Sequence, residues 1–201
     1  MTVIGITGPS GAGKGAVSII LREKYSFHII DADSIYHSLV SAPSPCLEEI
    51  TLHFGSCVIN ENGALDRKAL SPLVFGIGNE DKLLLLNKIT HKYVIEKILS
   101  DIEHCKARSA NCVVDAPLLF EADLQKYCDF TISVIADAKS RIERIVTRDN
   151  ISKEKAMERI SSQKSDDYYT SRANYVINNN GDISLLESSV AKMLSERSVA
   201  T

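Results

Sequence analysis

The sequence predicts an α/β fold built on a five-stranded parallel sheet. Three observations support this prediction: β-branched runs recur along the chain, segments of helical apolar spacing separate them, and a glycine-rich loop follows the first run. No internal repeat or linker-like stretch interrupts the alternation, so we expect one domain that spans residues 1–201. The five expected strands are residues 3–7, 27–30, 111–117, 130–135 and 175–177.

The first half of the chain begins with a strand and then alternates. Residues 3–7 form a nearly continuous apolar run, as expected for a strand buried on both faces of a parallel sheet. After the glycine-rich loop, Val17, Ile20 and Leu21 recur at helical spacing. Further helices are expected at roughly 33–41, at 45–54, from Leu65 onward and over about 80–105.

The second half continues the same alternation. Val94, Ile98 and Ile102 are four residues apart and favour a long helix before the third strand. Ser152 is a candidate N-cap, because Glu154 follows in the first turn of a polar helix. The later helices are expected at about 138–148, 152–164 and from 183 to 193.

The composition excludes several functional classes. The chain has 201 residues, of which 44 % are apolar and 24 % charged, and its formal net charge is −3. These values argue against disorder, and the absence of a basic excess argues against a non-specific nucleic-acid binder. The longest apolar run, residues 83–86, is far too short for a membrane span, and no signal peptide is visible. We therefore expect a cytoplasmic protein without a nucleic-acid or membrane partner.

Cysteine usage also indicates a reducing compartment. The chain has 5 cysteines, an odd number, and none stands in a CxxC pattern. Core packing is therefore expected for them ahead of redox or metal chemistry. They are Cys46, Cys57, Cys105, Cys112 and Cys128.

The sharpest motif is the loop at residues 8–16, here called the phosphate loop. Residues 8–14 fit the pattern GxxxxGK between a predicted strand and a predicted helix. Glycines let backbone N–H groups converge on an anion, the helix N-terminus adds partial positive charge, and Lys14 adds a full charge. The alternative is a glycine-rich turn with an exposed lysine. The expected phosphate contacts are Gly11, Ala12, Gly13, Lys14, Gly15 and Ala16.

The loop departs from the usual pattern directly after Lys14. A Ser or Thr commonly follows the lysine and gives its hydroxyl to Mg²⁺, whereas this chain has Gly15 and Ala16. The string Gly-Pro-Ser-Gly-Ala-Gly-Lys-Gly resembles the loop of nucleoside monophosphate kinases. Mg²⁺ would then depend on phosphate oxygens, water and a carboxylate.

Two aspartates follow predicted strands. Asp33 and Asp115 are expected at the carboxyl edge of the sheet, where open parallel sheets bind ligands. A carboxylate there can accept the proton of an attacking hydroxyl or hold Mg²⁺ through water. The alternatives are a helix N-cap for Asp33 and a loop hydrogen bond for Asp115.

Three arginines share one face of a predicted helix. Arg141, Arg144 and Arg148 are spaced three and four residues apart. They form either a solvated basic face or a clamp for triphosphate charge, with Arg148 nearest to the hinge of the following polar segment. That segment, residues 149–172, is here called the lid segment and is expected to be mobile.

Several blocks in order resemble one family. They are residues 4–8, 31–35, 65–70, 74–75, 114–121, 144–149, 159–160, 163 and 173–181. Together they resemble the dephospho-coenzyme A kinase family over nearly the full chain. The resemblance implies a three-layer P-loop kinase fold with a helical acceptor-binding insertion at about 35–110 and a small helical lid at 149–172.

The resemblance also implies a reaction. The γ-phosphoryl group of ATP would pass, with Mg²⁺, to the ribose 3′-hydroxyl of dephospho-coenzyme A, which completes coenzyme A biosynthesis. Asp33 would be the general base and hold Mg²⁺ through water, while Lys14 and Arg148 act on the phosphates. The implied ATP contacts beyond the loop are Arg144, Asn179 and Gly181, and the implied acceptor contacts are Asp33, His91, Asp115, Pro117, Leu118 and Leu119.

Two alternatives remain open from the residues. The loop string favours a nucleoside monophosphate or small-metabolite kinase, and the missing hydroxyl at Gly15 and Ala16 favours a nucleotide-binding protein with weak catalysis. A GTPase is disfavoured, because no NKxD motif occurs. The expected partner is a small molecule, and the expected state is a monomer or a weak homo-oligomer.

Overall fold

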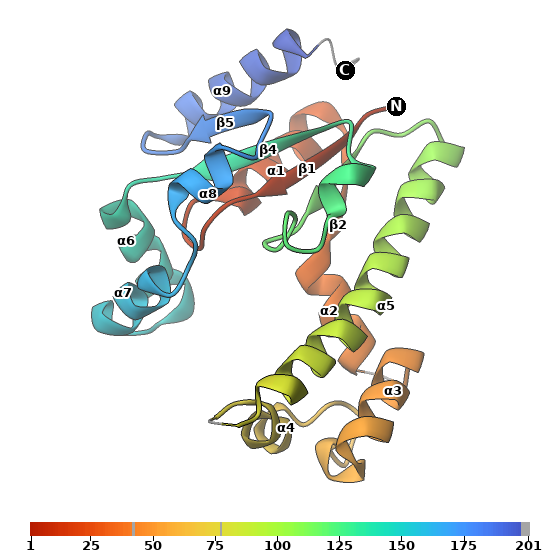
Figure 1. The fold of residues 1–201 in the computed structure, drawn as a ribbon. Coiled ribbons are helices and arrows are strands. Elements are labelled where there is room, and N and C mark those ends of the chain that lie inside the picture. The colour runs from red at the N-terminus through yellow and green to blue at the C-terminus, as the bar shows by residue number, and fades with distance from the viewer. Residues whose placement is uncertain (42, 77, 198–201) are drawn as a thin grey trace. The chain divides into compact units, whose positions relative to one another are not determined.

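Strands and helices alternate along the chain (Figure 1). The structure is a computed structural model and describes residues 1–41, 43–76 and 78–197. The strands are β1 (Val3–Thr7), β2 (His28–Asp31), β3 (Cys112–Asp115), β4 (Phe130–Ile135) and β5 (Tyr175–Asn178). The α-helices are α1 (Lys14–Tyr25), α2 (Ala32–Ser41), α3 (Pro45–Phe54), α4 (Arg67–Val74), α5 (Glu80–Ala107), α6 (Ala138–Asp149), α7 (Lys153–Ser161), α8 (Asp166–Thr170) and α9 (Ile183–Glu196). Two short 3₁₀ helices are η1 (Ser56–Val58) and η2 (Leu124–Tyr127).

The sheet is parallel and has the strand order β2-β3-β1-β4-β5. The central strand β1 is buried along its whole length, which explains its uninterrupted apolar sequence. In the register of the sheet, Ile6 pairs with Asp115 of β3 and Thr7 pairs with Ser133 of β4. The carboxyl ends of β1 and β3 therefore lie within one residue of each other, whereas β4 continues to Ile135, and the predicted five-stranded parallel sheet is confirmed.

Helices cover both sides of the sheet, as predicted for a three-layer P-loop kinase fold. Helices α1 and α9 pack on each other and on the sheet, while η2 and α8 contact β1 and β4. The core between α1, α9 and the strands consists of apolar side chains that are almost fully buried. They include Ile4, Ile6, Val17, Leu21, Ile132, Ile177, Val190 and Met193.

The chain divides into two compact units. One contains residues 1–30 and 102–201, and the other contains residues 31–101. The second unit holds α2, α3, α4 and most of α5 around its own core, which includes Leu47, Ile50 and Leu70. It overlaps most of the segment expected as the acceptor-side insertion, and the organisation as one domain stays a prediction.

Most helix boundaries agree with the sequence pattern, and the exception is the polar stretch after Asn150. Ser152 caps α7 by accepting from the amide of Lys155, as predicted, but α7 ends at Ser161 instead of continuing to residue 164. Gln163 follows the end of α7, and its side chain accepts from the amide of Ser10 and from Arg141. The short helix α8 was not predicted, because only five polar and aromatic residues form it after its cap, Ser165.

The cysteines are free thiols. Three of them, Cys46, Cys105 and Cys112, are buried as expected, whereas Cys57 is exposed. Burial raises the pKa of Cys112 and of the partly buried Cys128 to about 12, so both thiols are protonated at neutral pH. Within the described ranges, no helix is long and apolar enough to cross a membrane.

Candidate active site

The phosphate loop joins β1 to the start of α1. Gly13 is the N-cap of α1, its φ is 99°, and no side chain caps the helix. A glycine N-cap supplies no side-chain acceptor of its own, and a helix N-terminus of this kind is suited to binding an anion. A Cβ at residue 13 would lie 2.1 Å from Nδ2 of Asn179, so glycine is required by both conformation and space.

The ammonium group of Lys14 lies against the loop. Its Nζ donates to the carbonyl oxygen of Gly8 at 2.8 Å and is 3.5 Å from that of Pro9. The amide of Ala12 donates to the same Pro9 carbonyl at 3.3 Å. The lysine charge is thus held at the loop, where the motif places it for phosphate.

Arg141 is buried beneath the loop. Only 5 % of the residue is exposed, and its Nε donates to the carbonyl of Ser10 at 3.0 Å. Its Nη2 donates to Oε1 of Gln163 at 2.9 Å, and its Nη1 lies 3.3 Å from Oδ1 of Asp166. A solvated basic face is therefore wrong for Arg141, because the loop and the lid segment enclose its guanidinium group.

Arg144 and Asn179 hold the next part of the loop. Arg144 Nη1 donates to the carbonyls of Gly11 and Ala12 at 3.2 and 3.3 Å, and its Nη2 donates to the carbonyl of Asn179 at 2.9 Å. Asn179 is buried directly after β5, and its Nδ2 donates to the carbonyl of Ala12 at 2.9 Å. The structure therefore brings these two predicted ATP contacts together at the loop.

Gly181 lies in the exposed turn before α9. A Cβ there would approach the Leu185 side chain to 2.6 Å, so a larger residue would displace that side chain. Asp182 then caps α9 by accepting from the amide of Leu185.

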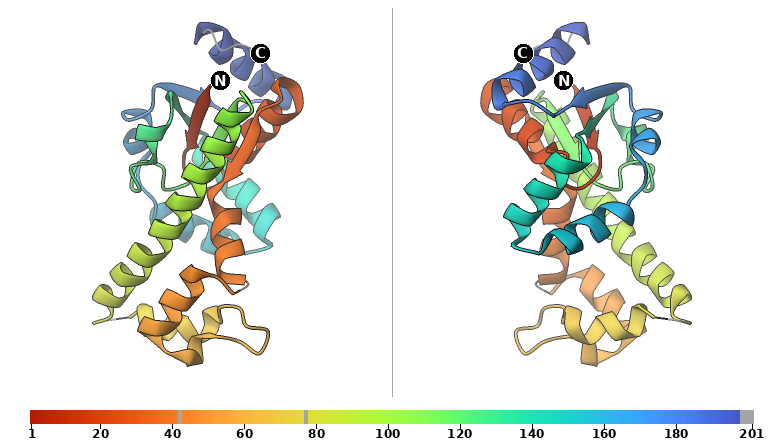
Figure 2. Two further views of the ribbon diagram at one scale, coloured as in Figure 1. Left: turned by 90° about the vertical axis from the view of Figure 1, so that its right-hand side faces the viewer. Right: turned by 90° about the vertical axis from the view of Figure 1, so that its left-hand side faces the viewer.

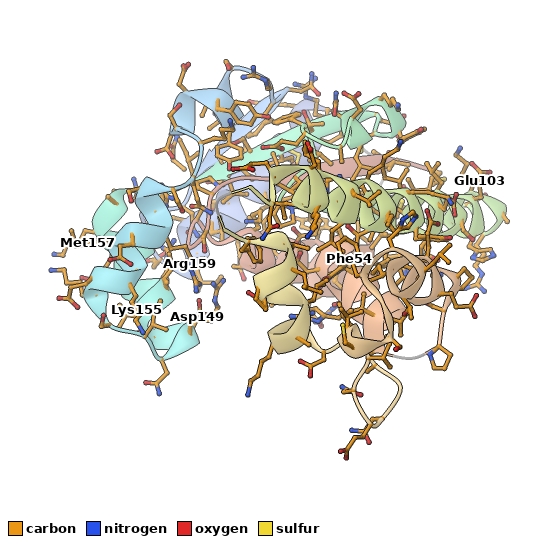
Figure 3. The ribbon with its side chains drawn as sticks, turned by 60° about the horizontal axis from the view of Figure 1, so that its bottom comes forward. Phe54, Glu103, Asp149, Lys155, Met157 and Arg159 are labelled. Carbon is orange, nitrogen blue, oxygen red and sulfur yellow. The ribbon has the colours of Figure 1, made fainter. Side chains whose placement is uncertain are left out.

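Arg148 lies at the end of α6 and pairs with Asp149, the first residue of the lid segment. Its Nε and Nη2 donate to the two carboxylate oxygens of Asp149 at 2.7 and 2.9 Å. Arg159 of α7 binds the same carboxylate, and Figure 3 shows Arg159 and Asp149 beside each other. Helices α6 and α7 pack together (Figure 2). Sequence reasoning gave Arg159 no role of its own.

The arginines alter the titration of Asp149. Hydrogen bonds from Arg148, and next from Arg159, lower the pKa of the Asp149 carboxyl from its usual 3.8 to about 2. The carboxylate is therefore charged at every physiological pH and continues to hold both guanidinium groups.

Asp115 is placed by β3 and by α1. Ser18 Oγ, one turn after Lys14, donates to its Oδ2 at 2.8 Å. Ser18 is 5 % exposed, and sequence reasoning missed it, because one serine within a helix carries no signal for this contact.

The segment after Asp115 contains three predicted acceptor contacts with different surroundings. Thr7 Oγ1 donates to the carbonyl of Pro117 at 3.1 Å, which ties the segment to the end of β1. Leu119 is fully buried, and its side chain and that of Cys128 are what a Cβ at Gly5 would meet. Leu118 is 48 % exposed, so it offers the larger accessible apolar surface.

In the second unit, Asp33 lies exposed in the first turn of α2. The residue that caps this helix is Asp31, which accepts from the amide of Asp33 at 3.0 Å and from Ser34 Oγ at 2.7 Å. The interpretation of Asp33 as the N-cap is therefore wrong, since Asp31 caps the helix. His91 lies partly buried on α5 of the same unit.

The second unit also contains an arginine that the sequence analysis did not single out as a site residue. Arg67 Nη2 is 2.8 Å from Nδ1 of His37, and its guanidinium carbon lies 5.5 Å from the centre of the Tyr36 ring. These contacts join the start of α4 to α2.

Comparison with known proteins decides the family. The model of the dephospho-CoA kinase family matches residues 2–184. The chain belongs to the dephospho-CoA kinase family. The resemblance found in the sequence is thereby confirmed, and the chain is a kinase enzyme.

Individual members of the dephospho-CoA kinase family are similar to this chain over most of their length. A dephospho-CoA kinase of Bacillus cereus is 40 % identical over 182 residues, which cover 90 % of each chain. One of Saccharomyces cerevisiae is 36 % identical over 188 residues, covering 91 % of this chain and 77 % of the yeast protein. The solved dephospho-CoA kinase of Campylobacter jejuni has a TM-score of 0.70 and 25 % identity, covering 98 % of this chain and 96 % of its own.

The lowered pKa of Asp149 predicts a pH-dependent stability difference. Because the folded-state pKa lies below the unfolded one, the paired carboxylate stabilises the fold above about pH 5, and this contribution disappears as the pH falls from about 4 to about 2. Asp149→Asn should therefore have a lower Tm than the wild type at neutral pH, with a difference that shrinks to zero in acid. Thermal unfolding at a series of pH values measures this, and a difference that stays constant down to about pH 2 would contradict it.

Proposed function

We propose that the chain transfers the γ-phosphoryl group of ATP to the ribose 3′-hydroxyl of dephospho-CoA, giving coenzyme A and ADP. This is the last step of coenzyme A biosynthesis. The observation that carries the proposal is the family match over residues 2–184. A phosphate loop between the central strand and α1 supports it independently, because that loop binds a nucleoside triphosphate.

On the ATP side, we assign the triphosphate to the amides of the phosphate loop and to Lys14. Phosphoryl transfer depends on positioning and on stabilising charge more than on covalent chemistry. Arg144 and Asn179 bind carbonyls of the loop and so hold its backbone, and we assign the adenine to the neighbourhood of Asn179 and Gly181. The residues assigned to phosphate contact are Gly11, Ala12, Gly13, Lys14, Gly15 and Ala16.

We assign the charge that develops on the transferring group to Arg148. Its side chain is 60 % exposed, and its guanidinium group already holds a bidentate carboxylate in Asp149. A phosphate offers the same pair of oxygens with more charge, so Arg148 exchanges Asp149 for the transferring phosphoryl group when ATP is bound. Arg159 keeps Asp149 paired during that exchange.

On the acceptor side, we assign Asp33 as the general base. An exposed carboxylate that does not cap its own helix is available to accept the proton of the 3′-hydroxyl. His91, Asp115 and Pro117 are assigned to acceptor binding with Leu118, whose side chain is exposed. Leu119 is assigned to this region as well, although its side chain is buried.

Mg²⁺ fits this chain through carboxylate and phosphate oxygens. Gly15 and Ala16 offer no hydroxyl, and the next hydroxyl on α1, that of Ser18, donates to Asp115. Among the described residues, no cluster of three or more His, Cys, Asp or Glu side chains forms a ready metal site. Carboxylate oxygen is a preferred ligand of Mg²⁺, so we assign Asp33 to hold it through water. When bound, the ion neutralises charge on the triphosphate.

The organisation we propose is one kinase domain over residues 1–201, with acceptor-side helices at about 35–110 and a lid at 149–172. It acts in the cytoplasm on a small molecule as a monomer or weak homo-oligomer. The lack of a basic excess in the sequence favours a small-molecule partner over nucleic acid.

The proposed function predicts ADP release that requires dephospho-CoA. The purified chain is incubated with ATP and Mg²⁺, and ADP is followed by a coupled assay with dephospho-CoA, with AMP, or without an acceptor. Release with dephospho-CoA alone is the expected result. Release with AMP instead would indicate a nucleoside monophosphate kinase, and tight ATP binding without turnover would indicate a binding protein.

Asp33→Asn should abolish most of this activity. Asparagine keeps the shape of the side chain but cannot accept the proton, so kcat should fall by about 10² to 10⁴. Asp81→Asn is the matched control, because Asp81 is also exposed in the first turn of a helix of the second unit. Wild-type kcat in Asp33→Asn, with an unchanged melting curve, would refute the assignment.

Ala16→Thr should reduce the Mg²⁺ concentration that half-maximal activity requires by several fold. The substitution restores a hydroxyl that can reach the ion near the loop. Ala16→Val has nearly the same shape without the hydroxyl and is the control. A Mg²⁺ titration of ADP release separates the two, and identical curves for Thr and Val would rule out a hydroxyl effect.

A further inference from the structure

The peptide groups of Ser10, in the phosphate loop, are held from outside the loop. The amide of Ser10 donates to Oε1 of Gln163 at 3.0 Å, and its carbonyl accepts from Nε of Arg141 at 3.0 Å. Gln163 lies between α7 and α8, and Arg141 lies on α6. The lid segment therefore contacts the loop backbone directly, 153 residues away in sequence.

The two hydrogen bonds of the Gln163 side chain are both accepted by one atom, its oxygen Oε1. Oε1 accepts from the Ser10 amide and from Nη2 of Arg141 at 2.9 Å. Since both neighbours are donors, the side-chain oxygen and not the nitrogen must face them. The position therefore requires an acceptor that can serve two donors.

The loop has little freedom to compensate if this contact is lost. Gly11, the next residue, has a φ of 77°, and a Cβ there would lie 2.7 Å from the carbonyl oxygen of Arg141. The loop thus packs directly on α6 at this point. A rotation of the Ser10 peptide would be transmitted to Gly11 and to the amides that follow it.

We propose that Gln163 is a positioning residue for phosphoryl transfer, whose uncharged side-chain oxygen fixes the Ser10 peptide, together with Arg141, in the conformation that receives the triphosphate. This inference rests on the proposed function. Gln163 touches neither reactant and acts through the loop.

Gln163 accepts these two hydrogen bonds without carrying a negative charge. A glutamate would accept from the same two donors and would pair more strongly with Arg141. It would also place a negative charge beside a loop that binds a polyanion, which lowers affinity for ATP. Glutamine supplies the acceptor without that repulsion, so Gln163→Glu separates the role of the acceptor from the role of the charge.

The experiment compares three variants of the full chain. Gln163→Leu removes the acceptor by substituting an apolar side chain of similar size. Gln163→Glu keeps the acceptor and adds a negative charge. The control is Gln125→Leu, at the other glutamine of the sequence, which is similarly half-buried on η2 and donates to Asp123. The measurements are the Kd for ATP by calorimetry, kcat and KM with dephospho-CoA, and the melting curve.

Gln163→Leu should weaken ATP binding about tenfold and lower kcat, because roughly one net hydrogen bond that orders the loop is lost. Gln163→Glu should keep the wild-type kcat and melting curve while its KM for ATP rises, and Gln125→Leu should bind ATP like the wild type. Wild-type ATP affinity in Gln163→Leu overturns the inference. So does a loss of kcat in Gln163→Glu as large as in Gln163→Leu, which also decides the matter if the leucine variant does not fold.

The two proposals can fail separately. The Kd for ATP requires no acceptor, so it tests the role of Gln163 even if dephospho-CoA is not phosphorylated. Absence of turnover in the wild type would defeat the proposed function, whereas normal turnover with wild-type ATP affinity in Gln163→Leu would defeat only the role of Gln163.

Discussion

The parallel pairing of β1 between β3 and β4 is the constraint on which the nucleotide site depends. Ile6 lies opposite Asp115 and Thr7 opposite Ser133, so β1 ends within one residue of β3 and beside β4, which continues to Ile135. The phosphate loop begins at the next residue, and its position is therefore set by the backbone hydrogen bonds of the sheet. A slip of one residue would exchange the two faces of β1 and move the loop away from α6.

Once the sheet has placed the loop, side chains from elsewhere fix its conformation. Arg141, Gln163, Arg144 and Asn179 all bind its backbone, and three of its carbonyls accept from them. The loop is therefore shaped largely before any ligand binds, which lowers the ordering cost of binding. Positive charge is concentrated here, although the whole chain carries a net charge of −3.

Sequence patterns could predict the fold and the loop, because both depend on local signals. The apolar runs specify the strands, and GxxxxGK between a strand and a helix specifies the anion site. The spacing of Arg141, Arg144 and Arg148 correctly predicts a shared helix, but it carries no information on what the helix faces. The burial of Arg141 was therefore missed.

Other contacts of the site were not predicted for the same reason, namely that helical or strand spacing does not indicate tertiary neighbours. The contacts of Gln163 with Ser10 and of Ser18 with Asp115 join residues far apart in the sequence. Asp31 and Asp33 are equally good caps on composition, and only the backbone at the end of β2 decides between them. The fold thus follows from periodicity, whereas the support of the site depends on tertiary contacts that no local pattern encodes.

The bond between Asn179 and Ala12 has a consequence for how the protein is made. It joins residues that are 167 positions apart, so the loop is synthesised well before the partner that holds it. Domains fold as units during translation, and such distant contacts close late. A nascent chain that has not yet released β5 from the ribosome therefore lacks the bond from Asn179 to the phosphate loop. The phosphate loop therefore gains its full set of backbone contacts only after β5 has joined the sheet.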